Sequence, residues 1–269
     1  FSDETFAGGV SCEDRDGLFA MKLHDTVFDR SFRAIKSYFY FGDEIVALGS
    51  NIRCADAERR VETTLFQCRL PDPHTPVVVQ SERIAQLPYI WPNASGGPVR
   101  FTDPCGNGYV VADASKLHIE RDVQHSIDHR GVEATSGEYA VAWIDHGPAP
   151  EDGEYEYAVL VQTTPERLAA YAHDVPYRVV RKDEAAHIVE HTVMQAFGYA
   201  VFDETVRLPD GPLRMASAPI AAFVKRSGGG LIVSVADPDL RLPKLANQRM
   251  DDRTAWTESE PAKVAVELR

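Results

Sequence analysis

The sequence predicts an all-β fold made of antiparallel sandwiches. Short runs rich in β-branched and aromatic residues recur along the 269 residues, with Gly, Pro, Asn and Asp turn signals between them. A strong hairpin signal lies at residues 37–48, where SYFYF and EIVAL flank the turn pair Gly42-Asp43. One short helix is expected, at Pro165 to Ala172, with Thr164 as its N-cap. Many short strands and a single helix favour antiparallel sheets over a parallel α/β fold.

The first strands follow from alternation and turn residues. Leu18 to Leu23 alternates and is expected to form a strand before the hairpin. Gly49-Ser50-Asn51 is expected to end the second hairpin strand, because Gly and Asn favour turns. The polar, arginine-rich residues 53–60 are then expected to form a surface loop.

The segment VETTLFQ, Val61 to Gln67, is expected to be a third strand because it is rich in β-branched residues. A period of two puts Val61, Thr63 and Leu65 on one face. The opposite face then carries Glu62, Thr64 and Phe66. A carboxylate that shares a face with a threonine and a phenylalanine must lie at a rim, be paired, or be functional.

The same signals predict the remaining strands and a division into two domains. Residues 88–104 are expected to be irregular, and Gly228-Gly229-Gly230 to form a hairpin turn. The predicted helix marks a seam between a central antiparallel β-sandwich, residues 1–165, and a smaller C-terminal β-sandwich domain, residues 166–269. Further strands are expected at 77–80, 109–112, 116–121, 138–145, 154–162, 177–182, 186–195, 199–202, 215–225, 231–236 and 263–268.

Composition limits the classes of partner. Charged residues make up 26% of the chain and apolar residues 44%, which is typical of a globular protein. The net charge of −13 argues against a nucleic-acid or anionic-membrane partner, because binding a polyanion requires clustered Lys and Arg. No apolar run approaches the roughly 20 residues that span a bilayer. The chain begins without Met and stops within a strand-like alternation, so we expect a fragment of a longer protein, truncated in its last domain.

The four cysteines, Cys12, Cys54, Cys68 and Cys105, allow three pairings if all are bridged. Their irregular spacing gives no metal signature, and no metal or cofactor is expected. Free thiols are the favoured interpretation, and one bridge remains open.

Several strings together resemble a known family in collinear order over nearly the whole chain. That family is polysaccharide lyase family eight, the chondroitin and hyaluronan lyases, with the chondroitin sulfate ABC lyases in particular. The similarity is to their β-sheet region. The strings are FAGG (6–9), MKLHDTVFD (21–29), SYFYFGDEIVALGSNI (37–52), VETTLFQ (61–67), CGNGY (105–109), AWIDHG (142–147), YEYAV (155–159), YRVVRKDEAAHIV (177–189) and LIVSVADPDL (231–240).

The resemblance implies cleavage of a uronate-containing glycosaminoglycan by β-elimination. A base removes the C5 proton, the sugar at C4 leaves, and the uronate carboxylate is neutralised. In the family a tyrosine, a histidine and an arginine of a preceding α/α-toroid domain do this, and a glutamate of the β-domain holds the arginine and tyrosine. The matching position here is Glu62. The resemblance also implies a secreted or periplasmic enzyme whose partners are the polysaccharide and that helical domain.

Alternatives remain at this point. Glu62 could be a strand-edge carboxylate paired with Arg59 or Arg60. The chain could be a non-catalytic carbohydrate-binding or structural β-module. It could also belong to a lyase of the same family for another uronate polymer, such as xanthan.

Three histidine patterns have simpler explanations than catalysis. His24-Asp25 and Asp145-His146 lack a Ser or Cys nucleophile at recognisable spacing, so strand-end hydrogen bonding is favoured. His24 is the more plausible of the two to contact substrate. The H-x-x-E-H match at 187–191 lies in strand-like sequence, where four residues span about 13 Å, too far for two ligands of one zinc ion.

Overall fold

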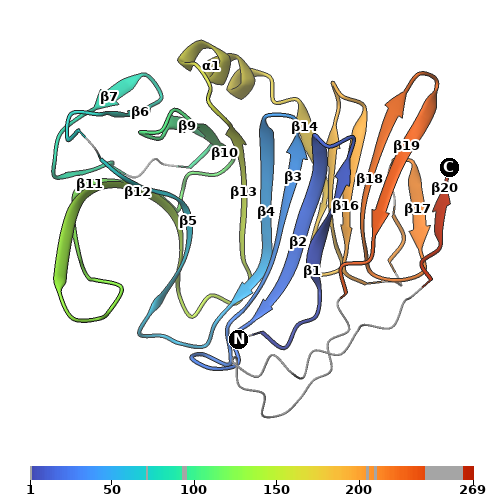
Figure 1. The fold of residues 1–269 in the computed structure, drawn as a ribbon, viewed down its shortest axis with the longest axis horizontal. Coiled ribbons are helices and arrows are strands. Elements are labelled where there is room, and N and C mark those ends of the chain that lie inside the picture. The colour runs from blue at the N-terminus through green and yellow to red at the C-terminus, as the bar shows by residue number, and fades with distance from the viewer. Residues whose placement is uncertain (1, 71, 93–95, 204–205, 209–210, 240–262) are drawn as a thin grey trace.

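The chain forms antiparallel β-sheets stacked in layers, as shown by a computed structural model that describes residues 2–70, 72–92, 96–203, 206–208, 211–239 and 263–269. A four-stranded sheet, a nine-stranded sheet and a five-stranded sheet follow one another across the molecule, and a two-stranded sheet lies at the far side (Figure 1). The predicted all-β, antiparallel sandwich fold is confirmed.

The nine-stranded sheet is the middle layer. Its central hairpin turns at Gly42, whose φ of +67° is the left-handed conformation that glycine adopts readily, and this confirms the predicted turn. In spatial order its strands are β1 (Ala7–Cys12), β2 (Asp16–His24), β3 (Arg33–Phe41), β4 (Glu44–Arg53), β13 (Gly153–Leu160), β10 (Gly108–Val111), β9 (Val99–Thr102), β6 (Val77–Val79) and β7 (Glu82–Ile84).

The other sheets cover its two sides and extend the stack. The four-stranded sheet contains β5 (Arg60–Arg69), β12 (Ala134–Pro148), β11 (Leu117–Ile127) and β8 (Tyr89–Ile90). The five-stranded sheet contains β14 (Tyr177–Lys182), β15 (Ala186–His191), β16 (Ala196–Val201), β18 (Ile220–Ser227) and β19 (Gly230–Ala236). The two-stranded sheet pairs β17 (Leu213–Ala216) with β20 (Val266–Leu268).

The helix α1 (Pro165–His173) forms where it was predicted. Thr164 is its N-cap, and the Thr164 hydroxyl accepts a hydrogen bond from the backbone N–H of Arg167 at 3.2 Å. Leu168 is the buried residue of the helix, and it packs against Val110 and Leu160 at one end of the nine-stranded sheet. The helix therefore closes that end and leads the chain toward the five-stranded sheet.

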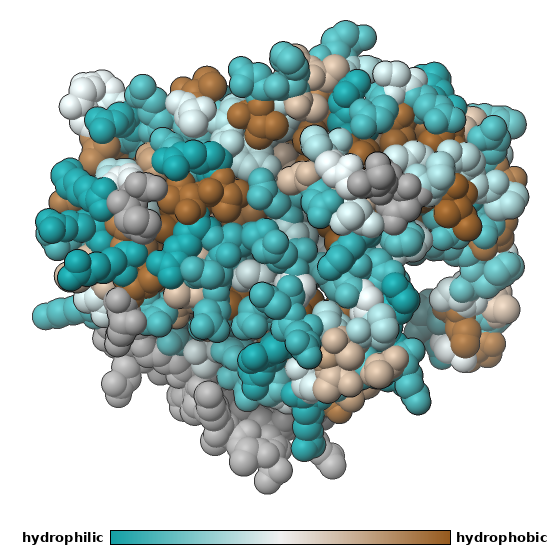
Figure 2. All heavy atoms as spheres, turned by 180° about the vertical axis from the view of Figure 1, so that it is seen from behind, coloured by the Kyte–Doolittle hydropathy of each residue, from teal (hydrophilic) through white to brown (hydrophobic). Residues whose placement is uncertain are grey.

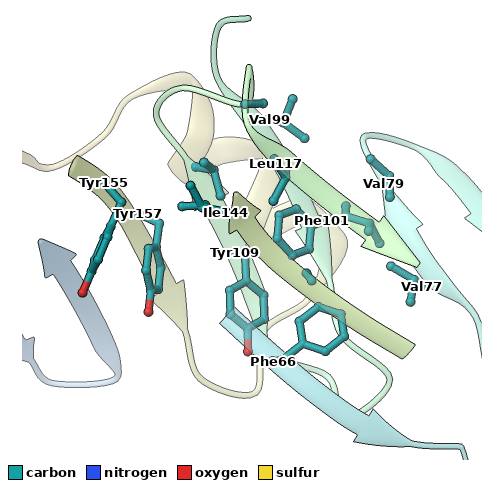
Figure 3. Packing of buried hydrophobic residues seen from close by; sticks show 14 of the residues in the cluster. Phe66, Val77, Val79, Val99, Phe101, Tyr109, Leu117, Ile144, Tyr155 and Tyr157 are labelled. Carbon is teal, nitrogen blue, oxygen red and sulfur yellow. The ribbon is translucent and has the colours of Figure 1, made fainter. Parts of the chain in front are cut away.

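The first core lies between the nine-stranded and four-stranded sheets. Aromatic side chains from both sheets fill it, and the rings of Phe101 and Tyr109 stack at 5.1 Å between centroids (Figure 3). Phe66 of β5 packs on Tyr109 at 5.5 Å, so the β5 backbone is anchored from inside the sandwich. Burial of aromatic side chains stabilises such a core by roughly 1.5–3 kcal/mol each.

A second core joins the nine-stranded sheet to the five-stranded sheet. Phe39, Val46 and Leu48 pack there with Val189 and Phe223. This core contains residues from both sides of the proposed boundary at residue 165, so the two parts share buried surface. The boundary itself stays a prediction.

The expected end of β4 at Gly49-Ser50-Asn51 is wrong. The strand continues to Arg53. Its pairing with β3 shifts register between Arg33 and Ile35, which forms a β-bulge, and Asn51 lies in this bulge with a left-handed φ of +51°. Gly49 serves packing rather than a turn: a Cβ there would lie 2.1 Å from the ring of Tyr155. The glycine lets the ring lie against the backbone of the sheet.

Two other expectations need correction. Residues 88–104, expected to be irregular, contain the short strands β8 and β9. Residues 215–225, expected to be one strand, are divided between β17 and β18, which belong to different sheets. In both places pairing with distant strands decides the outcome, and local propensity does not carry that information.

The face of the molecule seen from behind is mostly hydrophilic (Figure 2). In the view from behind, hydrophobic residues lie between hydrophilic ones rather than in one continuous band (Figure 2). Within the described ranges, no helix has the length and apolar character needed to cross a bilayer.

Gly198 tests the packing of the second core. An ideal Cβ at Gly198 would lie 2.3 Å from the Phe39 ring of the facing sheet. We expect Gly198→Ala to lower the free energy of unfolding by about 1–3 kcal/mol, because the overlap forces the two sheets apart. Urea denaturation measures this. Gly230→Ala is the control, since its nearest non-neighbour atom is 3.8 Å away, and it should change stability by less than about 0.5 kcal/mol. Equal effects of the two variants would contradict the sheet contact.

Candidate functional site

Glu62 lies on the outer face of the four-stranded sheet. On β5, Val61 and Thr63 turn toward the first core, and Thr63 is only 6% exposed. Glu62 and Thr64 are exposed, and Asp145 of β12 is the cross-strand partner of Glu62. Glu62 is therefore displayed on the side of the sheet that does not pack against the nine-stranded sheet.

Phe66 does not share that face, so this part of the predicted alternation is wrong. Thr64 pairs with Trp143 and Phe66 pairs with the adjacent Ala142, which leaves Leu65 as an extra residue in β5. This β-bulge reverses the alternation and turns Phe66 into the first core. Glu62 is thus exposed on the outer face and does not share that face with Phe66.

The two arginines near Glu62 are paired with other acids. Arg60 Nε donates a hydrogen bond to Asp145 Oδ2 at 2.7 Å, and Arg59 lies 3.8 Å from Asp56. Burial acts to raise the pKa of Asp145, but Arg60 and the Gly147 N–H outweigh it and hold that pKa below its usual range. Among the described residues, Glu62 has no hydrogen-bond or ion-pair partner, so its carboxylate is available to a group outside this part of the chain.

An aromatic pair lies on the same sheet, two residues along from the pairing of Glu62 with Asp145. The rings of His118 and Trp143 stack at 5.0 Å and 11°, and Trp143 pairs in register with Thr64. His118 Nε2 also lies 3.8 Å from Asp145 Oδ2. The outer-face cluster is defined here as Arg60, Glu62, Thr64, His118, Trp143 and Asp145.

The outer-face cluster offers two kinds of contact. The Glu62 carboxylate can accept hydrogen bonds from a guanidinium or hydroxyl group, and the stacked rings can pack against the C–H face of a sugar. Arg60 is committed to Asp145 and so is poorly placed to neutralise a substrate carboxylate. The sequence did not single out His118 or Trp143. Alternation could have put each on an outer face, but only the pairing of β11 with β12 brings them together.

Asp145 and His146 do not act as a pair. Asp145 faces Arg60 on the outer side, whereas His146 is buried and shares a hydrogen bond of 2.9 Å with the Thr63 hydroxyl. The pairing of β12 with β5 shifts register between Asp145 and Gly147, and the side chains of Asp145 and His146 point to opposite sides of the sheet. Burial lowers the pKa of His146 to about 4, with Lys116 and Lys36 acting in the same direction. The predicted strand-end hydrogen bonding is what this segment shows.

His24 is the last residue of β2 in the nine-stranded sheet, so it and Glu62 lie in different sheets. Its Nδ1 contacts Asp3 Oδ1 at 2.5 Å and its Nε2 contacts the carbonyl oxygen of Arg30 at 3.0 Å. Both ring nitrogens are engaged, and the side chain is 11% exposed. A contact of His24 with substrate stays a prediction.

The H-x-x-E-H segment forms β15, which confirms the strand interpretation. His187 is buried between the Ser37 and Ser50 hydroxyls at 2.7 and 2.8 Å, and His191 lies 3.3 Å from Glu44. Glu190 pairs with Arg178 instead. No group of three metal-ligating side chains occurs among the residues with described positions.

Comparison with known proteins identifies the class of this architecture. Residues 1–172 match the super-sandwich domain of polysaccharide lyase family 8. The fold is similar to that of a solved Paenibacillus xanthan lyase, with a TM-score of 0.77 and 22% identity over 89% of this chain and 24% of that one. The layered sheets are thus a lyase super-sandwich.

Sequence relatives lead to the same family. The chain is 31% identical over 248 residues to the chondroitin sulfate ABC endolyase of Proteus vulgaris, covering 89% of this chain and 24% of the relative. It is 34% identical over 245 residues to the chondroitin sulfate ABC exolyase of Bacteroides thetaiotaomicron, covering 90% and 23%. The chain belongs to polysaccharide lyase family 8, as the sequence motifs predicted. It spans about a quarter of the length of these curated relatives.

His187 should make stability depend on pH. Burial lowers the pKa of His187 to about 3, with Lys182 acting in the same direction, whereas an unfolded histidine titrates near 6.5. Between these values the unfolded chain binds the extra proton, so stability present above pH 6.5 is lost as the pH falls. We expect His187 to account for a loss of about 3 kcal/mol between pH 7 and pH 4.

Urea denaturation at pH 7 and pH 4 measures this loss, and His187→Asn is the comparison because asparagine does not titrate. Between the two pH values the variant should lose about 3 kcal/mol less of its free energy of unfolding than the unsubstituted protein, whatever its stability at pH 7. The same loss in both proteins would rule out a neutral, buried His187.

Proposed function

We propose that this chain is the β-sandwich part of a glycosaminoglycan lyase, with chondroitin sulfate, dermatan sulfate or hyaluronan as substrate, and that Glu62 is its contribution to the active site. The single observation that carries the role of Glu62 is its exposed carboxylate on the outer face of β5, with both nearby arginines paired elsewhere. The relatives named for chondroitin sulfate, at 31% and 34% identity, support the substrate class.

The chemistry of β-elimination explains why such a carboxylate is useful. The C5 proton of a uronate is weakly acidic while the adjacent carboxylate is charged, so a cation must neutralise that carboxylate. An arginine that does so must be held in place, and a fixed glutamate can hold it through charge-assisted hydrogen bonds. In this proposal Glu62 is a positioning residue: it orients an arginine and a tyrosine of a helical domain and does not move the proton itself.

The charge of the chain fits a site in which this chain supplies the glutamate and another domain supplies the cations. A net charge of −13 and an arginine already paired with Asp145 leave the outer-face cluster poorly suited to hold a polyanion alone. The cations that bind substrate are therefore assigned to the helical domain, and the stacked His118 and Trp143 would add a flat surface for a sugar ring. Because such polymers are too large to enter a cell, we also propose that the enzyme is secreted or periplasmic.

Glu62→Gln tests the proposal in the full-length enzyme. The amide keeps the shape but removes the charge that would hold an arginine, so we expect kcat to fall by roughly two to four decades. KM should change by less than about threefold, because other residues hold the polyanion. Formation of the unsaturated uronate, followed by ultraviolet absorbance, measures both constants.

Glu82→Gln is the control, since Glu82 is an exposed strand glutamate of β7 in the nine-stranded sheet. It should retain near wild-type turnover. Wild-type turnover of a folded Glu62→Gln enzyme would disprove the positioning role and favour a non-catalytic carbohydrate-binding module. Activity on xanthan rather than on chondroitin or hyaluronan would retain the mechanism and replace the substrate.

The isolated chain should produce no unsaturated uronate from chondroitin or hyaluronan. In this proposal the base and the group that neutralises the carboxylate belong to the helical domain, so residues 1–269 lack both. Product formed by the purified chain above the level of a mock purification would place the reacting groups within these residues.

A further inference from the structure

Two cysteines that are far apart in the sequence lie next to each other. Cys68 is on β5, Cys105 is in the turn between β9 and β10, and their sulfur atoms are 3.7 Å apart. Cys105 is exposed and Cys68 is half-buried. Cys12 is buried in the second core, and Cys54 donates a hydrogen bond to Asp29 at 2.8 Å, so neither belongs to this pair.

The turn that carries Cys105 is held by the buried Asp103, which is 4% exposed. The Asp103 carboxylate accepts hydrogen bonds from the backbone N–H groups of Cys105 and Asn107, at 2.8 and 2.9 Å, and from the Tyr109 hydroxyl at 3.2 Å. Gln162 Nε2 donates to the Cys105 carbonyl oxygen at 2.8 Å. These contacts fix the backbone of Cys105 from two sides, while its side chain stays accessible.

A separate set of contacts holds Cys68. It pairs in register with Ala140 of β12, and its side chain packs against the first core. Cys68 therefore belongs to the four-stranded sheet, whereas the Cys105 turn belongs to the nine-stranded sheet. The two thiols are brought together by the packing of the sandwich itself.

We propose that Cys68 and Cys105 form a reversible disulfide that links the two sheets across the rim of the first core. A disulfide requires sulfurs about 2.05 Å apart, so the two atoms must approach by less than about 2 Å. Rotation of the exposed Cys105 side chain can supply this movement without displacing a strand. The proposal rests on no part of the lyase assignment.

The oxidant is a small-molecule disulfide such as oxidised glutathione, and the exposed Cys105 reacts first. Burial raises the pKa of Cys68 to about 12, with the contact to Cys105 and the charge of Asp103 adding to it, so Cys68 is the poorer first nucleophile. The Cys105 thiolate attacks one glutathione sulfur, the glutathione disulfide breaks, and one glutathione leaves as a thiolate that takes up a proton. Cys68 then loses its proton and attacks the Cys105 sulfur, which releases the second glutathione. Two protein thiols lose two electrons, and one glutathione disulfide becomes two thiols.

The bridge can be detected in the whole chain. The purified protein is equilibrated in a glutathione buffer with excess disulfide form, quenched with acid, alkylated in denaturant and digested for mass spectrometry. We expect one crosslinked peptide, joining Cys68 to Cys105, and alkylated Cys12 and Cys54. Tm should rise by about 5–10 °C on oxidation and return after reduction, because the bridge closes a loop of 37 residues.

Three variants separate the steps. Cys105→Ser should leave Cys68 as a free thiol and abolish the redox-dependent change in Tm. Cys68→Ser should stop with one glutathione attached to Cys105. Cys54→Ser is the matched control and should keep the bridge.

Several results would overturn the proposal: four alkylated thiols after oxidation, a bridge that includes Cys12 or Cys54, or a glutathione that stays on Cys105 in the unsubstituted protein. If Cys68→Ser does not fold, the exposed Cys105→Ser variant and the peptide map of the unsubstituted protein still decide the matter.

Discussion

Burial of the nine-stranded sheet on both faces is the constraint on which the rest of the structure depends. Strands β3 and β4 supply apolar side chains to the first core on one face and to the second core on the other. Close packing on two sides requires glycine where an aromatic ring meets backbone, as at Gly49 and Gly198. His187 is a buried polar group between two serine hydroxyls, and both of its ring nitrogens are hydrogen-bonded, as is usual for buried polar groups.

The same constraint explains where Glu62 can act. The inner face of the four-stranded sheet is occupied by the first core, so a functional carboxylate on β5 has to lie on the outer face. Two register shifts in the pairing of β5 with β12 flank it, one at Leu65 and one at His146. Bulges increase the local twist of a strand, and here they set the direction of a short segment that contains Glu62. On the inner side, Phe66 packs on Tyr109 and Thr63 shares a hydrogen bond with His146, so the segment is held against the first core.

Local signals predicted much of the fold but little of its assembly. The turn at Gly42-Asp43 and the helix start at Thr164 could be read from the sequence because their chemistry is local. The face of Phe66 could not, because a bulge depends on the partner strand. Glu62 was singled out by its family motif. Spacing alone favoured an ion pair with Arg59 or Arg60, but in the structure Arg59 lies near Asp56 and Arg60 binds Asp145. The neighbouring stack of His118 on Trp143 required the register of two strands.

The second core has a practical consequence for dissecting this protein. All strands of the nine-stranded sheet precede residue 165, and the family match ends at residue 172. A polypeptide cut at that point would contain the complete middle sheet but would expose the side of it that carries Phe39, Val46 and Leu48 to water. Apolar faces of that kind promote self-association. The residues after α1 therefore cover this apolar face of the middle sheet and keep it from water. A shortened polypeptide would be more soluble if apolar residues on that side were replaced by polar ones.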